Sequence, residues 1–197
     1  MEQPQVTPQE TSELLRLAEA ALSADGDFVE LGCYRGDTSV LLQKLLVSAR
    51  SDKSLWLYDS FAGLPEKTAE DASSAGTAFR GGELFVTKRE VVEKFKKQNL
   101  PLPRIKKAFF EALDPERDLP GKIAFAFLDG DLYGSIQTSF RLVVPKLSEK
   151  GIIVVHDYNN PELPGAARAV DEFLAAHPSF QLSQHFSLAI LKPVVLY

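Results

Sequence analysis

The sequence predicts an α/β fold in which helices cover both faces of a doubly wound, mostly parallel sheet of seven strands. Short apolar segments alternate with segments of helical spacing along the 197 residues, which is the pattern of βαβ units. Residues 123–128 and 151–155 are apolar without alternation, as expected of central parallel strands covered on both faces. The last two predicted strands, 180–184 and 186–191, are close enough in sequence to form a C-terminal antiparallel pair.

The first elements have clear helix and strand signals. Thr7, Pro8 and Glu10 stand where an N-cap, a first helical residue and a capping-box acid are expected, which predicts a helix over residues 8–22. An apolar strand follows at residues 28–31. The same signals assign helices to residues 38–46, 135–144 and 166–176, and strands to residues 55–58 and 105–110.

Residues 61–86 differ in composition from the rest of the chain. They are rich in Gly, Ser, Thr and Ala, and they are longer than an ordinary connection in a compact domain. Such loops commonly form a lid or a binding loop. Thr87 and Glu90 then form a second capping box that starts a helix with apolar residues on one side. We expect residues 61–100 to form a lid insertion.

The bulk properties limit the classes of protein to which the chain can belong. Its length suits one domain over residues 1–197. A formal net charge of −5 and a pI near 5.3 argue against a nucleic-acid partner, since such proteins usually carry a basic excess. The single cysteine excludes an internal disulfide and a cysteine-rich zinc site. The polar N-terminus and the lack of an apolar run near ~20 residues predict a cytoplasmic globular protein with no membrane partner.

The turn after the first strand contains the first candidate site. Gly32 and Gly36 allow a tight turn and a close approach to a ligand, and the following helix presents free backbone N–H groups. The spacing lacks the middle glycine that lets a pyrophosphate approach, which disfavours an NAD or FAD site. Asp59 ends the second strand, where an acid commonly accepts hydrogen bonds from ribose hydroxyls. Each feature alone is also compatible with an ordinary turn.

Acidic residues follow two further strands of the predicted sheet. Asp129 and Asp131 come directly after the strand at 123–128, and His156 and Asp157 follow the next strand. Because ligands bind beyond the carboxyl ends of parallel strands, these side chains are expected near one another. Carboxylates suit Mg²⁺, and a free carboxylate there could remove a proton from a hydroxyl. Exposed loop acids and an ordinary surface histidine are the alternative.

Five blocks of sequence occur together, in the same order, in one known family. They are ELGCYRG at 30–36, DSFAGLP at 59–65, LDGDLY at 128–133, HDY at 156–158 and PGAARAVDEF at 164–173. Through these blocks the chain resembles the macrocin O-methyltransferase family of class I methyltransferases, over about residues 28–174. That family methylates sugar hydroxyls in antibiotic biosynthesis. The resemblance implies a Rossmann-like fold, S-adenosylmethionine as cofactor and a small-molecule hydroxyl acceptor.

The resemblance also implies roles for individual residues. Asp131 would be the general base, and Asp129 would bind Mg²⁺. The resemblance further implies a mobile lid over the site and often a dimer. The expected cofactor-binding residues, from the resemblance and from the glycine turn, are Glu30, Gly32, Tyr34, Gly36, Thr38, Asp59, Ser60 and Asp129.

One position departs from the family pattern. The family usually has two adjacent aspartates as metal ligands after the fifth strand, whereas this chain has His156 followed by Asp157. The expected ligands of a divalent metal are therefore Asp129, His156 and Asp157. Neutral imidazole is a poorer match than carboxylate for hard Mg²⁺, so a weaker metal, a different metal and no metal all stay open.

The combined expectation is an S-adenosylmethionine-dependent O-methyltransferase that acts on a hydroxyl of a small molecule, such as a sugar of a natural product. Two alternatives stay open. A nucleotide-dependent oxidoreductase would have a similar parallel sheet, but the glycine turn lacks the middle glycine of a dinucleotide site, which disfavours this alternative. A non-catalytic relative would keep the cofactor pocket, and the histidine at position 156 is the feature that favours it.

Overall fold

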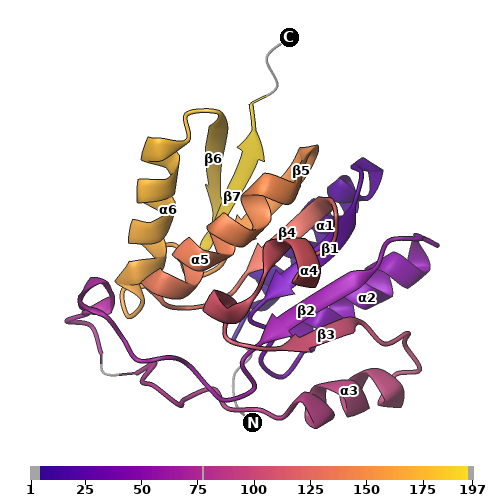
Figure 1. The fold of residues 1–197 in the computed structure, drawn as a ribbon, viewed down its shortest axis with the longest axis horizontal. Coiled ribbons are helices and arrows are strands. Elements are labelled where there is room, and N and C mark those ends of the chain that lie inside the picture. The colour runs from indigo at the N-terminus through magenta and orange to yellow at the C-terminus, as the bar shows by residue number, and fades with distance from the viewer. Residues whose placement is uncertain (1–4, 77, 195–197) are drawn as a thin grey trace.

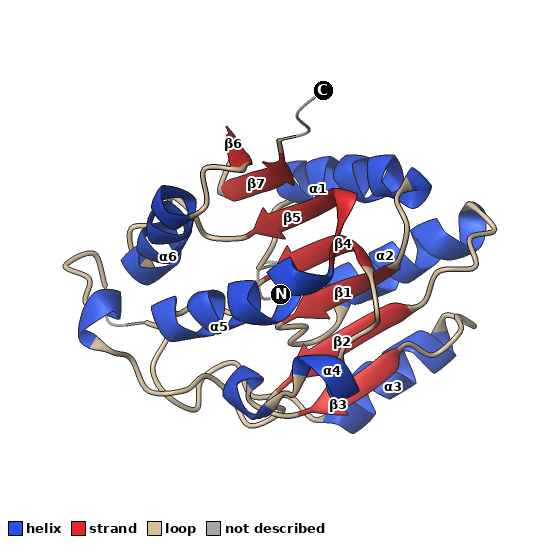
Figure 2. Cartoon of the chain, turned by 45° about the horizontal axis from the view of Figure 1, so that its top comes forward, coloured by secondary structure: helices blue, strands red, loops and turns tan. Residues whose placement is uncertain are grey.

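The computed structural model describes residues 5–76 and 78–194, which build a seven-stranded sheet between two helical layers (Figures 1 and 2). The strand order is β3-β2-β1-β4-β5-β7-β6, parallel from β3 to β5, with β7 antiparallel to both of its neighbours. The strands are β1 Asp27–Leu31, β2 Leu55–Asp59, β3 Arg104–Lys107, β4 Ile123–Leu128, β5 Leu147–Val155, β6 Phe180–His185 and β7 Leu188–Pro193. The predicted fold class is confirmed, and the order reverses between β1 and β4, where such sheets bind ligands.

Helices α1, α2 and α3 lie on one face of the sheet, and α4, α5 and α6 lie on the other (Figure 2). The helices are α1 Pro8–Ala20, α2 Asp37–Ser48, α3 Lys88–Lys97, α4 Pro115–Asp118, α5 Tyr133–Val143 and α6 Pro164–Ala176. Across the described ranges, none of these helices is both long enough and apolar enough to cross a bilayer.

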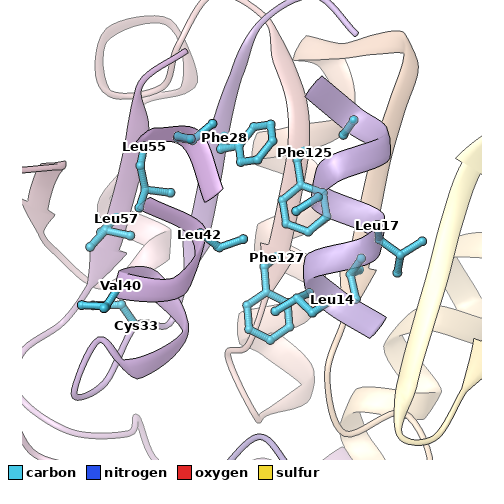
Figure 3. Packing of buried hydrophobic residues seen from close by; sticks show 14 of the residues in the cluster. Leu14, Leu17, Phe28, Cys33, Val40, Leu42, Leu55, Leu57, Phe125 and Phe127 are labelled. Carbon is cyan, nitrogen blue, oxygen red and sulfur yellow. The ribbon is translucent and has the colours of Figure 1, made fainter. Parts of the chain in front are cut away.

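Each face of the sheet buries its own apolar cluster. Phe125 and Phe127 of β4 pack beside Leu14 of α1 and the apolar residues of α2 (Figure 3). Ala126 and Leu128, the alternate residues of the same strand, pack on the opposite side with α5 and α6. All four β4 residues are fully buried. Burial on both faces explains why this strand has no polar alternation.

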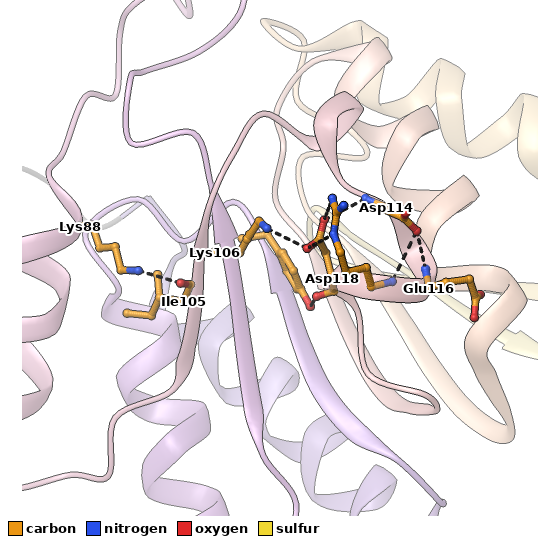
Figure 4. A network of polar contacts seen from close by, with 8 residues as sticks. Lys88, Ile105, Lys106, Asp114, Glu116 and Asp118 are labelled. Atoms are coloured by element: carbon orange, nitrogen blue, oxygen red, sulfur yellow. Dashed lines mark hydrogen bonds and ion pairs between the residues drawn. The ribbon is translucent and has the colours of Figure 1, made fainter.

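A polar network holds the segment after β3 against the sheet (Figure 4). The buried carboxylate of Asp118 accepts hydrogen bonds from Lys106 Nζ at 2.7 Å and from the backbone N–H of Asp114 at 3.0 Å. The hydroxyl of Tyr58 donates to the carbonyl oxygen of Asp118 at 2.8 Å. These contacts fix the loop that carries Phe110 to the C-terminal edge of the sheet.

Several element ends differ from the expectation. The third strand ends at Lys107 and does not reach Phe110, because residues 110–112 form a 3-10 turn that buries the Phe110 ring. Phe186 lies in the turn of the final hairpin with a φ of 57° and is exposed. The helix predicted over residues 8–22 ends at Ala20 and continues as a 3-10 turn.

The segment expected to be a lid divides into two parts. Helix α3 belongs to the packed layer, since Val91 and Phe95 are fully buried in the cluster beneath it. Residues 61–86 form an extended loop that contains only a short 3-10 turn among its described residues. A lid role therefore remains a prediction for residues 61–86.

Candidate active site

The turn between β1 and α2 brings the backbone of β1 against the end of β4. Gly32 has a φ of 91°, and a Cβ at this position would overlap the carbonyl oxygen of Asp129. Gly36 is the N-cap of α2 with a φ of 73°, a conformation that glycine adopts without strain. Thr38 lies in the first turn of the same helix. Both glycines are therefore needed to shape the turn.

Asp59 closes this turn from the end of β2. Its Oδ2 accepts hydrogen bonds from the backbone N–H groups of Cys33 and Tyr34, each at 3.0 Å. Its Oδ1 accepts from the backbone N–H of Phe61 at 2.8 Å. The residue expected to bind ribose thus first organises the backbone of the glycine turn. A carboxylate has about four acceptor positions, so capacity for one further donor remains.

Glu30 is an acid buried within β1. Only 1% of it is exposed, and its Oε2 accepts a hydrogen bond from Ser39 Oγ at 2.5 Å. Burial raises the pKa of Glu30 to about 8, and the negative charges of Asp129 and Asp59 act in the same direction. The structure therefore keeps a neutral acid near physiological pH unless a cation approaches it.

Two cavities open at this edge of the sheet. The first is lined by residues that follow β1, β2, β4 and β5, and the second, of about 420 Å³, lies between residues 5–11 and the start of α2. Tyr34 and Asp129 line both, so the cavities adjoin there. The predicted site residues on the first cavity are Gly32, Tyr34, Asp59, Ser60, Asp129, Asp131, His156 and Asp157. Those on the second are Glu30, Tyr34, Thr38 and Asp129.

The acids after β4 and β5 gather around one imidazole ring. His156 Nδ1 lies 2.9 Å from Asp129 Oδ1 and 2.9 Å from Asp157 Oδ2. His156 Nε2 lies 3.7 Å from Glu10 Oε2, which comes from the first turn of α1. One nitrogen or oxygen atom each of Asp129, His156 and Asp157 lies within 4.8 Å of the other two. The strand ends thus bring together the three side chains that were expected to share a site.

Charge and burial together set the pKa values in this cluster. Burial disfavours a charged imidazole, but the surrounding carboxylates, Asp129 foremost, outweigh it and raise the pKa of His156 well above its usual range. Burial raises the pKa of Asp131 well above its usual range, and the charges of Asp129 and Asp157 add to that effect. Asp131 lies on the first cavity, within reach of a ligand bound there.

The backbone is strained at two of these acids. Asp131 and Asp157 both have a φ of 59°, in the left-handed region that aspartate occupies more readily than most residues. Strained backbone concentrates at functional sites, where the surrounding structure holds it in place.

The loop at residues 61–86 is fastened beside the first cavity. At its base, the N–H of Leu64 donates to the carbonyl oxygen of Glu83 at 2.8 Å. Further along, buried Asp71 accepts a hydrogen bond from the backbone N–H of Tyr133 at 2.7 Å, which ties the loop to the start of α5. Leu64 and Leu84 of the loop line the cavity, so the loop forms one of its walls.

Comparison with known proteins identifies the family. The family model described as macrocin O-methyltransferase (TylF) matches residues 13–181. The chain belongs to the macrocin O-methyltransferase family. The matched region contains β1 to β5, the glycine turn and every acid that lines the two cavities.

Two curated relatives are about 30% identical to this member of the macrocin O-methyltransferase family over the residues that align. Demethyldecarbamoylnovobiocin O-methyltransferase of Streptomyces niveus is 30% identical over 157 residues, which are 76% of this chain and 58% of the relative. The 8-demethyl-8-(2,3-dimethoxy-alpha-L-rhamnosyl)-tetracenomycin-C 4'-O-methyltransferase of Streptomyces olivaceus is 31% identical over 141 residues, which are 68% and 53%. The chain therefore spans less than two thirds of the length of the curated relatives it matches.

Solved structures agree with this membership. The O-methyltransferase NovP superposes with a TM-score of 0.81 at 25% identity, over 95% of this chain and 80% of that one. The calicheamicin methyltransferase CalS11 superposes with a TM-score of 0.76 at 18% identity, over the same shares, which shows a common fold.

The structure adds two side chains to the candidate site that the sequence of this macrocin O-methyltransferase family member did not reveal. The sequence assigned Glu10 only to the capping box, but its second oxygen also accepts hydrogen bonds from the N–H and hydroxyl of Ser187. That contact depends on how α1 meets the final hairpin, which no local pattern encodes. Ser39 was also missed, although its place in the first turn of α2, facing β1, is a usable signal.

Proposed function

We propose that the protein is an S-adenosylmethionine-dependent O-methyltransferase that acts on a hydroxyl of a small natural product, with a sugar hydroxyl as the first candidate. The observation that carries the proposal is the position of Asp131, a carboxyl side chain on a cavity that also contains the glycine turn. The two curated relatives support the acceptor class, since both are named as O-methyltransferases and one name specifies a rhamnosyl group.

The glycine turn and its neighbours suit the cofactor. We place the cofactor along Gly32, Asp59 and Ser60, where a bare backbone and free acceptor positions meet the first cavity. Buried Glu30 lies on the adjoining cavity and would become a carboxylate next to a cationic amine of the cofactor. Asp129 lines both cavities, and we propose that its carboxyl group faces both the cofactor and the acceptor.

The proposed reaction is a direct displacement. The cofactor would supply a methyl group from its sulfonium, and the sulfur would leave as a neutral thioether. Asp131 takes the proton of the acceptor hydroxyl as the new oxygen–carbon bond forms and the carbon–sulfur bond breaks, so charge and atoms balance. Proton removal by a positioned base contributes typically about 10²–10⁴-fold. The rest comes from holding the two reactants in line, for which intramolecular reactions suggest up to about 7–11 kcal/mol.

The residues of this site do not match the ligands that Mg²⁺ requires. The two oxygens best placed to share an ion, Asp129 Oδ1 and Asp157 Oδ2, are both 2.9 Å from His156 Nδ1. A nitrogen between two carboxylates carries a proton and offers no lone pair to a metal. Mg²⁺ also requires near-octahedral oxygen ligands. The proposed reaction therefore has no metal step.

A non-catalytic relative that only binds the cofactor is the second candidate, and the imidazole among the acids is the observation that favours it. The two candidates differ in turnover. We would incubate the protein with S-adenosylmethionine and a library of glycosylated natural products and follow methylation by mass spectrometry. Methylated product that disappears in Asp131→Asn supports the methyltransferase, whereas cofactor binding without any product supports the non-catalytic relative.

Dimer formation and a cytoplasmic location stay predictions.

A further inference from the structure

We propose that the side chain of His156 takes the place of a divalent cation between Asp129 and Asp157, so that the acceptor site of this family member works without metal. This inference rests on the proposed function. It concerns the one block in which the chain departs from the family pattern of two adjacent aspartates. His156 acts here as a positioning residue, since it acts through the two carboxylates.

The hydrogen-bond geometry supports the exchange of metal for imidazole. Nδ1 of His156 is hydrogen-bonded to Asp129 Oδ1 at 2.9 Å, and it lies at an ion-pair distance of 2.9 Å from Asp157 Oδ2. Two carboxylates held this close in a low-dielectric site repel each other unless a positive charge lies between them. In the structure, the group between them belongs to the chain itself.

The other ring nitrogen supports a full positive charge. Nε2 of His156 faces the carboxylate of Glu10 at 3.7 Å, so both ring nitrogens are directed at acids. Glu10 is 5% exposed and is held in place by Thr7 and Ser187. His156 itself is 6% exposed, and its ring meets Phe127 edge-on with the centroids 6.2 Å apart. A buried charge of this kind is stable only when it is paired, and here it has three partners.

The consequence for the reaction is a fixed positive charge. A bound ion would be lost to chelators and would exchange between metals, whereas an imidazolium stays with the chain. The imidazolium keeps Asp129 and Asp157 in place beside Asp131. Unlike a metal ion, it offers no coordination position to the acceptor oxygen. The acceptor hydroxyl therefore depends on Asp131, and not on a Lewis acid, to lose its proton.

The test is a direct measurement of metal binding that needs no acceptor. Mn²⁺ is titrated into the wild-type chain and into His156→Asp, which rebuilds the pair of adjacent aspartates, and free Mn²⁺ is followed by electron paramagnetic resonance. We expect no specific site in the wild type and one site in His156→Asp. S-adenosylhomocysteine titrations report whether each variant keeps its fold and its cofactor pocket.

His185→Asp is the matched control. It makes the same substitution at a histidine whose side chain is 48% exposed and which pairs with Glu13, away from the cavity. It should bind no Mn²⁺. Where an acceptor has been found, wild-type turnover should be unchanged by EDTA, while His156→Asp turnover should depend on added Mg²⁺.

A wild-type chain that binds one Mn²⁺ per site, or that loses its turnover in EDTA and regains it with Mg²⁺, overturns the inference. A folded His156→Asp that binds cofactor but no Mn²⁺ also overturns it, because His156 would then not stand where a cation belongs. Failure of the proposed function appears differently, as absent cofactor binding in the wild type.

Discussion

The acids at the carboxyl ends of the parallel strands fall into two regions, which hold their acids in different ways. At β1 and β2, Glu30 and Asp59 accept hydrogen bonds from neutral donors, a serine hydroxyl and backbone N–H groups. At β4 and β5, Asp129 and Asp157 share one imidazole. Burial raises the pKa of Glu30 in the first region, so this acid can keep its proton until a cationic ligand arrives, whereas in the second region one imidazole lies between two carboxyl groups. The first region suits a cationic cofactor, and the second suits proton removal.

The largest expected effect comes from Asp131, which lies in the second region. Asp131→Asn keeps the shape of the side chain but removes the base, so turnover should fall by about 10²–10⁴-fold. Affinity for S-adenosylhomocysteine should stay within about twofold, because the cofactor side is unchanged. Initial rates and calorimetric titration of the same preparation measure both effects.

Glu111→Gln is the control for that substitution, because Glu111 is an exposed acid on the same cavity. Its turnover should stay close to that of the wild type. Normal turnover in Asp131→Asn would show that another group removes the proton.

The next effect concerns pH and the first region. The pKa of Glu30 is raised to about 8 in the folded protein by burial, against about 4.3 in an unfolded chain. Between these values the folded state holds a proton that the unfolded state has released. The free energy of unfolding of the cofactor-free protein should therefore fall as pH rises from about 5 to 8, by up to about 4 kcal/mol from this group.

Urea unfolding of the wild type and of Glu30→Gln between about pH 5 and pH 8 measures this slope. Glu30→Gln should flatten it, while Glu19→Gln, at an exposed acid on α1, should leave it unchanged. If the wild type and Glu30→Gln have the same slope, Glu30 does not hold a proton in the folded state. Cofactor binding near pH 7 should also release up to about one proton, seen by calorimetry in buffers of different ionisation enthalpy.

A smaller effect is expected where the two regions meet. Gly32→Ala forces a Cβ into the carbonyl oxygen of Asp129 at a φ of 91°. We expect a loss of about 1–3 kcal/mol in the free energy of unfolding, with weaker cofactor binding. Gly121→Ala, at a glycine whose Cβ would meet open space, should change stability by about 0.5 kcal/mol or less. Equal stability of the two variants would contradict the close approach of β1 to β4.

The smallest effect is expected from Asp59→Asn. The amide oxygen can still accept the N–H groups of Cys33 and Tyr34, so the glycine turn should persist, while the amide NH₂ can no longer accept the N–H of Phe61. Loss of the charge should weaken S-adenosylhomocysteine binding by about 1 kcal/mol, or ~5-fold. Asp52→Asn, at an exposed loop acid, is the control. A complete loss of binding in Asp59→Asn would mean that the charge itself holds the cofactor.

The sequence predicted the sheet and the gathering of acids for a simple physical reason. Continuous apolar runs mark strands covered on both faces, and the carboxyl ends of parallel strands meet at one edge. The acids after 123–128 and 151–155 therefore had to approach one another, and they do. Capping boxes at Thr7 and Thr87 located two helix starts in the same local way.

Local sequence patterns could not predict the tertiary contacts. That Asp59 binds the backbone of the glycine turn depends on the register of β2 against β1. That Glu10 faces His156 depends on the docking of α1 beside β7. The strand predicted over residues 105–110 stopped early because the Phe110 ring found a buried position, and burial overrode strand propensity.

The measurement that tests the central claim most directly is a calorimetric titration of the wild-type protein with S-adenosylhomocysteine, in EDTA and again in Mg²⁺. The proposed cofactor site predicts binding in the micromolar range with the same affinity in both buffers, because Glu30, Gly32 and Asp59 need no metal. Absence of binding in both buffers would contradict the methyltransferase assignment. Binding only with Mg²⁺ would contradict the metal-free site around His156.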